Sequence, residues 1–83
     1  MSLQTVEAIE EYIVTYIERE LHISSSEIDC DMSLGAFGMS SKSGLKLVGL
    51  LEDRLDIRID PKLIFAHPTI SRLSSALLDL LQK

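Results

Sequence analysis

The chain is poor in residues that form covalent cross-links and rigid turns. It has one cysteine, no tryptophan, two prolines and four glycines among 83 residues. The lone Cys30 excludes an internal disulfide and makes a metal cluster implausible, as expected in a reducing compartment. No apolar run approaches the ~20 residues that span a bilayer, and the first residues lack the layout of a signal peptide. We therefore expect a soluble, cytoplasmic protein with no membrane partner.

Basic residues are also in the minority. Eight Lys and Arg against thirteen Asp and Glu give a formal net charge of −5. This sign disfavours binding to nucleic acid and favours basic protein partners. A small DNA-binding bundle is a weak alternative because no basic recognition helix is present. A chain this short, with 46% hydrophobic residues, predicts a single domain over residues 1–83 with little room for a catalytic cleft.

Apolar residues at three- and four-residue spacing predict three longer helices, over about residues 4–21, 41–54 and 69–81. The stripe residues are Val6, Ile9, Ile13, Ile17 and Leu21, then Gly44, Leu47, Val48, Leu51 and Leu55, and finally Ile70, Leu73, Leu77 and Leu81. Thr69 is the expected cap of the last helix. A short helix ending near Ala66 is predicted to start with Asp60 as its cap and Pro61 at the first helical position.

The connecting segments complete an all-α prediction, a small four-helix bundle with a long loop between the first two helices. Residues 22–40 form that loop, pinned by Ile28, Leu34 and Phe37, with room for one helical turn within residues 25–30. Residues 55–60 alternate like a strand, but no partner strand exists elsewhere, so we interpret them as an extended connector.

The start of the second helix is the most informative segment. Phe37-Gly38-Met39-Ser40-Ser41-Lys42 places serine hydroxyls at a helix N-terminus, where unpaired N–H groups and the helix dipole favour a phosphate. A serine at a helix start is usually only a cap. We expect Ser40 to be the cap, which leaves the Ser41 hydroxyl free.

The rest of the second helix offers an exposed flank, which contains Lys42, Leu45, Lys46, Gly49, Glu52 and Asp53. Leu45 is either one of many surface leucines or an apolar contact for a partner, with Gly49 allowing close approach. His67 is interpreted as a turn residue packed against the short helix. Asp29 and Asp31 are interpreted as solvated turn formers, because the calcium-loop pattern is missing.

Two motifs resemble those of the acyl carrier proteins, especially the carrier domains of polyketide synthases. Gly38, Ser41 and Glu52 fit the family's attachment-site pattern, with a Glu eleven positions after the serine. Its apolar positions are occupied by Leu45, Leu47 and Leu51. Residues 63–73 are similar to the family segment LxFxHPTIxxL. The resemblance extends from about Ile9 to Leu81 and selects Ser41 over Ser40 and Ser43.

The resemblance implies a non-catalytic carrier. A separate phosphopantetheinyl transferase would use coenzyme A and magnesium to attach 4′-phosphopantetheine to Ser41. The arm's thiol would then present acyl groups as thioesters to ketosynthase, acyltransferase and other polyketide synthase enzymes. Their contact residues would be Lys42, Leu45, Lys46 and Gly49, on a monomeric carrier. Nothing near Ser41 forms a catalytic triad, since both histidines lie in distant segments.

Three positions depart from the family pattern. Ser40 stands where most relatives have Asp, Lys42 where most have Leu or Met, and Lys46 where an acidic or polar residue is common. We infer that partners docking on this flank differ from the usual basic patches. A peptidyl or fatty-acid carrier is the close alternative, and a helical interaction module without covalent modification is the alternative from another class.

Overall fold

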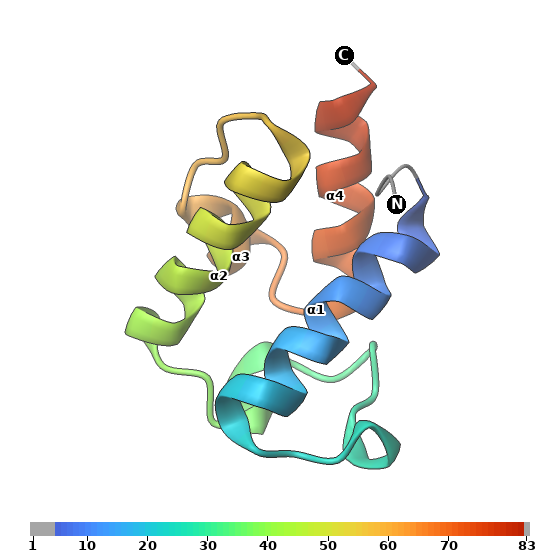
Figure 1. Ribbon diagram of the computed structural model, residues 1–83, viewed down its shortest axis with the longest axis vertical. Coiled ribbons are helices and arrows are strands. Elements are labelled where there is room, and N and C mark those ends of the chain that lie inside the picture. The colour runs from blue at the N-terminus through green and yellow to red at the C-terminus, as the bar shows by residue number, and fades with distance from the viewer. Residues whose placement is uncertain (1–4, 83) are drawn as a thin grey trace.

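The computed structural model describes residues 5–82, and these form four α-helices (Figure 1). The helices are α1 (Val6–Leu21), α2 (Ser41–Leu55), α3 (Lys62–Ala66) and α4 (Ile70–Leu81). The all-α prediction of three longer helices and one short helix is therefore confirmed. Residue 4, near which the first helix was predicted to begin, lies outside the described residues.

Side-chain caps account for where the helices begin. Thr5 accepts a hydrogen bond from the Ala8 N–H at the start of α1, and Thr69 accepts one from the Arg72 N–H at the start of α4. The prediction for α3 was wrong by one residue, because that helix begins at Lys62 and Pro61 occupies the cap position. The Asp60 carboxylate still accepts the Lys62 N–H at 2.9 Å.

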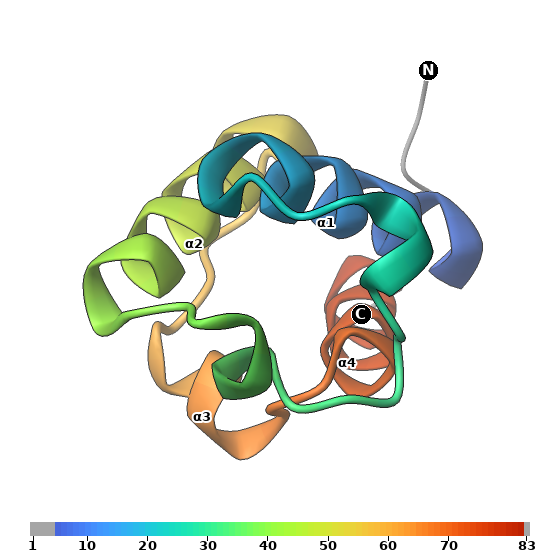
Figure 2. The same ribbon diagram turned by 90° about the horizontal axis from the view of Figure 1, so that it is seen from below.

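The core lies where α1, α2 and α4 face one another, and Figure 2 shows all four helices arranged around this centre. α1 and α4 make the most extensive interhelical contact. The middle residues of their apolar stripes are buried, as the helical periodicity predicted, while Val6, Leu21 and Leu81 at the helix ends are half-buried. The most deeply buried side chains are Ile9, Ile13, Ile17, Leu47, Leu51, Ile70, Leu73 and Leu77.

The long loop between α1 and α2 contains one helical turn more than the sequence predicted. It contains the expected turn, η1 (Ser25–Glu27), and an unpredicted second one, η2 (Leu34–Phe37). Two long-range hydrogen bonds tie the loop to the segment around the start of α4. The Leu34 N–H donates to the Pro68 carbonyl at 2.7 Å, and the Ser71 N–H, in the first turn of α4, donates to the Cys30 carbonyl at 3.0 Å. Leu34 and Phe37 are buried as predicted, whereas Ile28 is only half-buried.

The connector between α2 and α3 has no strand partner, as predicted, because residues 5–82 contain only one isolated bridge, between Ser33 and Thr69. The alternation of apolar and charged residues in this connector follows side-chain burial instead. Ile59 points into the core, while Asp56 and Arg58 are exposed. Within the described part of the chain, none of the helices is long and apolar enough to cross a membrane.

Candidate functional site

Ser40 and Ser41 have different structural roles at the start of α2. Ser40 has extended backbone, and its Oγ accepts the Ser43 N–H at 3.2 Å. This confirms Ser40 as the cap. Ser41 is the first helical residue and is exposed, and its hydroxyl has no hydrogen-bond partner among residues 5–82. The geometry therefore presents the Ser41 oxygen to solvent at the positive end of a 15-residue helix.

The turn before Ser40 depends on Gly38. Its φ of 82° lies in the left-handed region, which favours glycine. The Gly38 N–H donates to the Gly35 carbonyl and closes η2. Buried Phe37 anchors this turn to the core, so the chain leaves the packed loop and enters α2 in a defined direction.

Two contacts from α1 hold the first turns of α2. The Tyr16 hydroxyl donates to the Ser43 carbonyl at 2.8 Å. The Lys46 Nζ lies 3.0 Å and 3.1 Å from the two carboxylate oxygens of Glu20. Burial, and secondly the Glu20 charge, raise the pKa of the Tyr16 phenol. The start of α2 is therefore positioned by α1 as well as by its own cap.

Sequence reasoning missed this role of Tyr16, although a signal was present. Tyr16 adjoins the α1 stripe residue Ile17 and lies three residues after Ile13, and its side chain is 7% exposed. A buried tyrosine usually directs its hydroxyl to a partner. The ion pair of Lys46 also modifies the prediction of an exposed flank, because its ammonium group contacts Glu20 rather than standing alone.

Glu52 was placed on the exposed flank of α2, and this was wrong. Its side chain is half-buried, and its carboxylate accepts the Ile59 N–H at 2.9 Å. The helical wheel could not show that the connector after α2 folds back over this side chain. Glu52 thus fixes the approach of the chain to α3, while its neighbour Asp53 is exposed as predicted.

The remaining flank residues lie where the helical wheel placed them. Lys42 and Gly49 are exposed, and the side chain of Leu45 is 54% exposed. A Cβ added to Gly49 would meet nothing within 4 Å. Ser41, Lys42, Leu45 and Gly49 therefore form an accessible strip along α2 that ends at the free serine hydroxyl.

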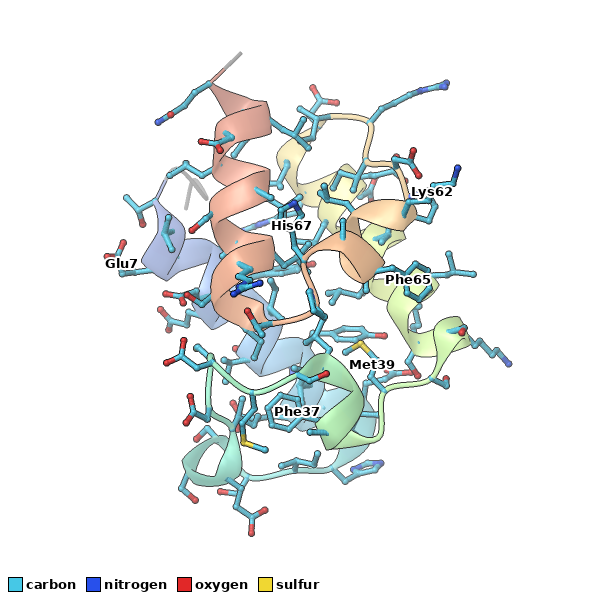
Figure 3. All side chains as sticks on the ribbon, turned by 180° about the vertical axis from the view of Figure 1, so that it is seen from behind. Glu7, Phe37, Met39, Lys62, Phe65 and His67 are labelled. Atoms are coloured by element: carbon cyan, nitrogen blue, oxygen red, sulfur yellow. The ribbon has the colours of Figure 1, made fainter. Side chains whose placement is uncertain are left out.

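A groove of about 240 Å³ opens beside Ser41, between η2, the start of α2, and α3. Its walls are mainly apolar and include three serines. The lining includes Leu34, Met39, Leu45, Ile64 and Phe65, together with Ser33, Ser40 and Ser41. Phe65, 68% exposed, lines the groove from α3 as Leu45 does from α2, and Figure 3 shows Phe65 on the same side of the molecule as Met39.

Other candidates from the sequence lie away from this groove. His67 ends α3, its N–H donating to the Leu63 carbonyl at 2.9 Å, which confirms it as a turn residue. Asp29 accepts the Asp31 N–H at 2.9 Å, which confirms the turn role of this pair. Neither His22 nor His67 lines the groove. Among residues 5–82, no group of three or more His, Cys, Asp or Glu is arranged to hold a metal ion.

Comparison with known proteins defines the class. Residues 11–77 match the family model described as "Phosphopantetheine attachment site". The chain therefore belongs to the phosphopantetheine attachment site family, whose members are acyl and peptidyl carriers and are generally non-catalytic. The group implied by this family is a covalently attached 4′-phosphopantetheine.

The sequence relatives are segments of polyketide synthases. A phenolphthiocerol/phthiocerol polyketide synthase from Mycobacterium tuberculosis is 30% identical over 66 residues, 80% of this chain and 4% of that protein. "Polyketide synthase 1" of Metarhizium album is 34% identical over 61 residues, 74% of this chain and 3% of that protein. The chain thus spans only a few per cent of the length of these relatives.

The similar solved structures are small carriers. A free-standing peptidyl carrier protein from Acinetobacter baumannii superimposes with a TM-score of 0.88 at 28% identity, covering 95% of this chain and 99% of the other. The acyl carrier protein Asl1650 from Anabaena sp. PCC 7120, described as having a variant phosphopantetheinylation-site sequence, gives a TM-score of 0.86 at 32% identity, covering 98% and 92%.

The start of α2 fits the phosphopantetheine group. A phosphodiester needs an accessible hydroxyl, nearby N–H groups or cations, and space for the arm. Ser41 is exposed at the N-terminus of α2, Lys42 follows it, and the adjacent groove contains no carboxylate. The site is therefore compatible with the family's group in both charge and access.

Proposed function

We propose that Ser41 carries the 4′-phosphopantetheine arm and that the chain presents acyl groups to the enzymes of a polyketide synthase. The supporting observation is the difference between the three serines at the start of α2. The Ser40 hydroxyl already caps the helix. Ser43 is half-buried, and its hydroxyl accepts from the Ser40 hydroxyl while its carbonyl accepts from the Tyr16 hydroxyl. Ser41 alone of these three combines exposure with a hydroxyl that has no partner within the described residues.

The attachment of the arm would be catalysed by a separate enzyme. A phosphopantetheinyl transferase would join the Ser41 Oγ to the phosphorus of the coenzyme A arm, releasing the hydroxyl proton and adenosine 3′,5′-bisphosphate. The groove contains no histidine or carboxylate to remove that proton, so the transferase must supply the base. When bound, the arm supplies a thiol that holds the cargo as a thioester.

The residues of the carrier contribute binding and orientation. The N-terminal N–H groups and dipole of α2, with the Lys42 ammonium, stabilise a phosphodiester on Ser41. The Ser40 cap and the Tyr16 bond hold that end of the helix in place. Lys42, Leu45 and Gly49 form the accessible strip that partner enzymes contact. Lys46 is also a contact residue, with its ammonium group paired to Glu20.

A peptidyl carrier is the second candidate, favoured by the likeness to the free-standing peptidyl carrier structure. Both candidates use the same serine and differ in the enzymes that load the arm. We further propose a monomer in the cytoplasm, where the free thiol of Cys30 would remain reduced.

Intact-mass measurement tests the attachment. The unmodified protein is incubated with coenzyme A, magnesium and a broad-specificity phosphopantetheinyl transferase. We expect a gain of one phosphopantetheine in the wild type and in Ser40→Ala and Ser43→Ala, and no gain in Ser41→Ala. Gain by Ser41→Ala would move the attachment to another residue. No gain by the wild type with transferases of two specificity classes would favour an unmodified interaction module.

A further inference from the structure

Two helices that line the groove each present a lysine and, three residues later, a large apolar side chain. On α2, Lys42 precedes Leu45 by three residues, and on α3, Lys62 precedes Phe65 by three. Residues three apart lie on the same face of a helix. Each exposed apolar side chain therefore has an exposed lysine beside it. Figure 3 shows Lys62 and Phe65 on the same side of the molecule.

Lysines outnumber carboxylates next to the groove, although the protein is acidic: Lys42 and Lys62 each adjoin a residue that lines it, and Asp60 is the carboxylate that does so. Among residues 5–82, Lys42 and Lys62 take part in no ion pair, in contrast to Lys46. No Asp or Glu lines the groove. The carboxylate nearest in sequence, that of Asp60, is turned to the Lys62 N–H.

The acidic residues are concentrated elsewhere. Eight of the thirteen lie between residues 7 and 31, where Arg19 is the only Lys or Arg. Figure 3 places Glu7 on the side opposite Lys62 and Phe65. At physiological ionic strength the Debye length is ~8 Å, so a partner at the groove is influenced mainly by the charges beside it. The net charge of −5 therefore does not decide what binds here.

Large exposed apolar side chains with polar surroundings are typical of protein interfaces. Phe65 is the most exposed of the large hydrophobic residues in the described part of the chain, at 68%, and Leu45 is next at 54%. The groove between them offers a place for an apolar side chain of a partner, and aromatic anchors in such pockets contribute strongly to binding. The flanking lysines favour carboxylates at the rim.

We infer that the face made by Lys42, Leu45, Lys62 and Phe65, here called the lysine face, docks an acidic surface of the enzymes that act on this carrier. An apolar side chain of the enzyme enters the groove between Leu45 and Phe65, and carboxylates on either side meet the two lysines. The inference rests on the proposed function for the identity of the partner and deepens it by specifying the partner's chemistry. It also replaces the basic partners expected from net charge.

The experiment uses unmodified, 15N-labelled protein, so it does not depend on loading of Ser41. Two helical peptides share one Leu/Phe stripe, which is flanked by Glu in the first peptide and by Lys in the second. We expect the Glu peptide to bind about five- to tenfold tighter, from the modest contribution of each exposed ion pair. Its binding should shift the amide signals of residues 42–45 and 62–65 and should weaken with added salt.

A charge-reversed variant and a matched control locate the effect. Lys42→Glu with Lys62→Glu should reverse the peptide preference. Arg19→Glu with Arg72→Glu makes the same change in net charge at exposed positions outside the lysine face and should leave the preference unchanged. Equal affinities, tighter binding of the Lys peptide, shifts confined to α1, or no binding of either peptide at millimolar concentration would overturn the inference.

Loading and docking can fail separately. If the protein gains phosphopantetheine but shows no preference for the Glu peptide, the proposed function is supported and the docking role of the lysine face is refuted. If the protein prefers the Glu peptide but never gains the arm, the proposed function is refuted and the lysine face remains supported as a surface for acidic partners.

Discussion

Replacing Glu52 tests whether its carboxylate holds the connector between α2 and α3. In Glu52→Ala the Ile59 N–H loses its acceptor, and Ile59 is only 4% exposed, so water replaces that bond poorly. A hydrogen bond to a charged acceptor contributes about 1.5–3 kcal/mol. Alanine is the better helix former by a few tenths of a kcal/mol. The net loss in free energy of unfolding should therefore be about 2 kcal/mol.

Urea unfolding followed by circular dichroism measures this loss, and a thermal scan should show Tm lower by about 8–16 °C for a chain of this size. Asp53→Ala is the matched control, because Asp53 is exposed on the same turn. It should change stability by no more than about 0.5 kcal/mol. Glu52→Gln keeps a neutral acceptor and should lose about half as much as Glu52→Ala.

Amide exchange gives the local readout. The Ile59 amide should lose protection in Glu52→Ala, whereas amides at the start of α2, roughly 16 Å away along the helix axis, should not. Equal stability of Glu52→Ala and Asp53→Ala, with the Ile59 amide still protected, would refute the role assigned to this carboxylate.

Three further changes probe other contacts. Tyr16→Phe removes the donor to the Ser43 carbonyl and should cost about 1 kcal/mol. Burial and Glu20 raise the pKa of Tyr16, so the wild type should also lose stability as pH rises above about 10, a loss absent from the variant. If the free energies of unfolding in urea of wild type and variant changed in parallel from about pH 7 to 11, this would be contradicted. Ser74→Ala removes a fully buried hydroxyl that has no hydrogen-bond partner within residues 5–82, and should raise unfolding free energy by about 1 kcal/mol; a lower Tm would show that the hydroxyl is satisfied. His22→Gly relieves a φ of 56° at the end of α1 and should gain about 0.5 kcal/mol in urea unfolding; a loss would show that His22 makes a stabilising contact.

The helices and the identity of the cap followed from local physics. Apolar spacing marks a helix face wherever the face is buried, and a serine cap acts on N–H groups two or three residues away. Ser40, Thr69 and the stripes of α1, α2 and α4 could therefore be assigned from residue spacing alone. The assignment of Glu52 failed because its partner, the Ile59 N–H, reaches it only after the chain reverses.

The sequence by itself determined an all-helical chain with a serine at the start of its second helix, because helical periodicity and capping act over a few residues. The tertiary structure decided which charges and apolar side chains meet. It paired Lys46 with Glu20, directed Tyr16 to the Ser43 carbonyl, and brought Leu45 and Phe65 into the lining of one groove. These pairs are separated by 20 or more positions in the chain, and only the packing of α1, α2 and α3 brings them within reach.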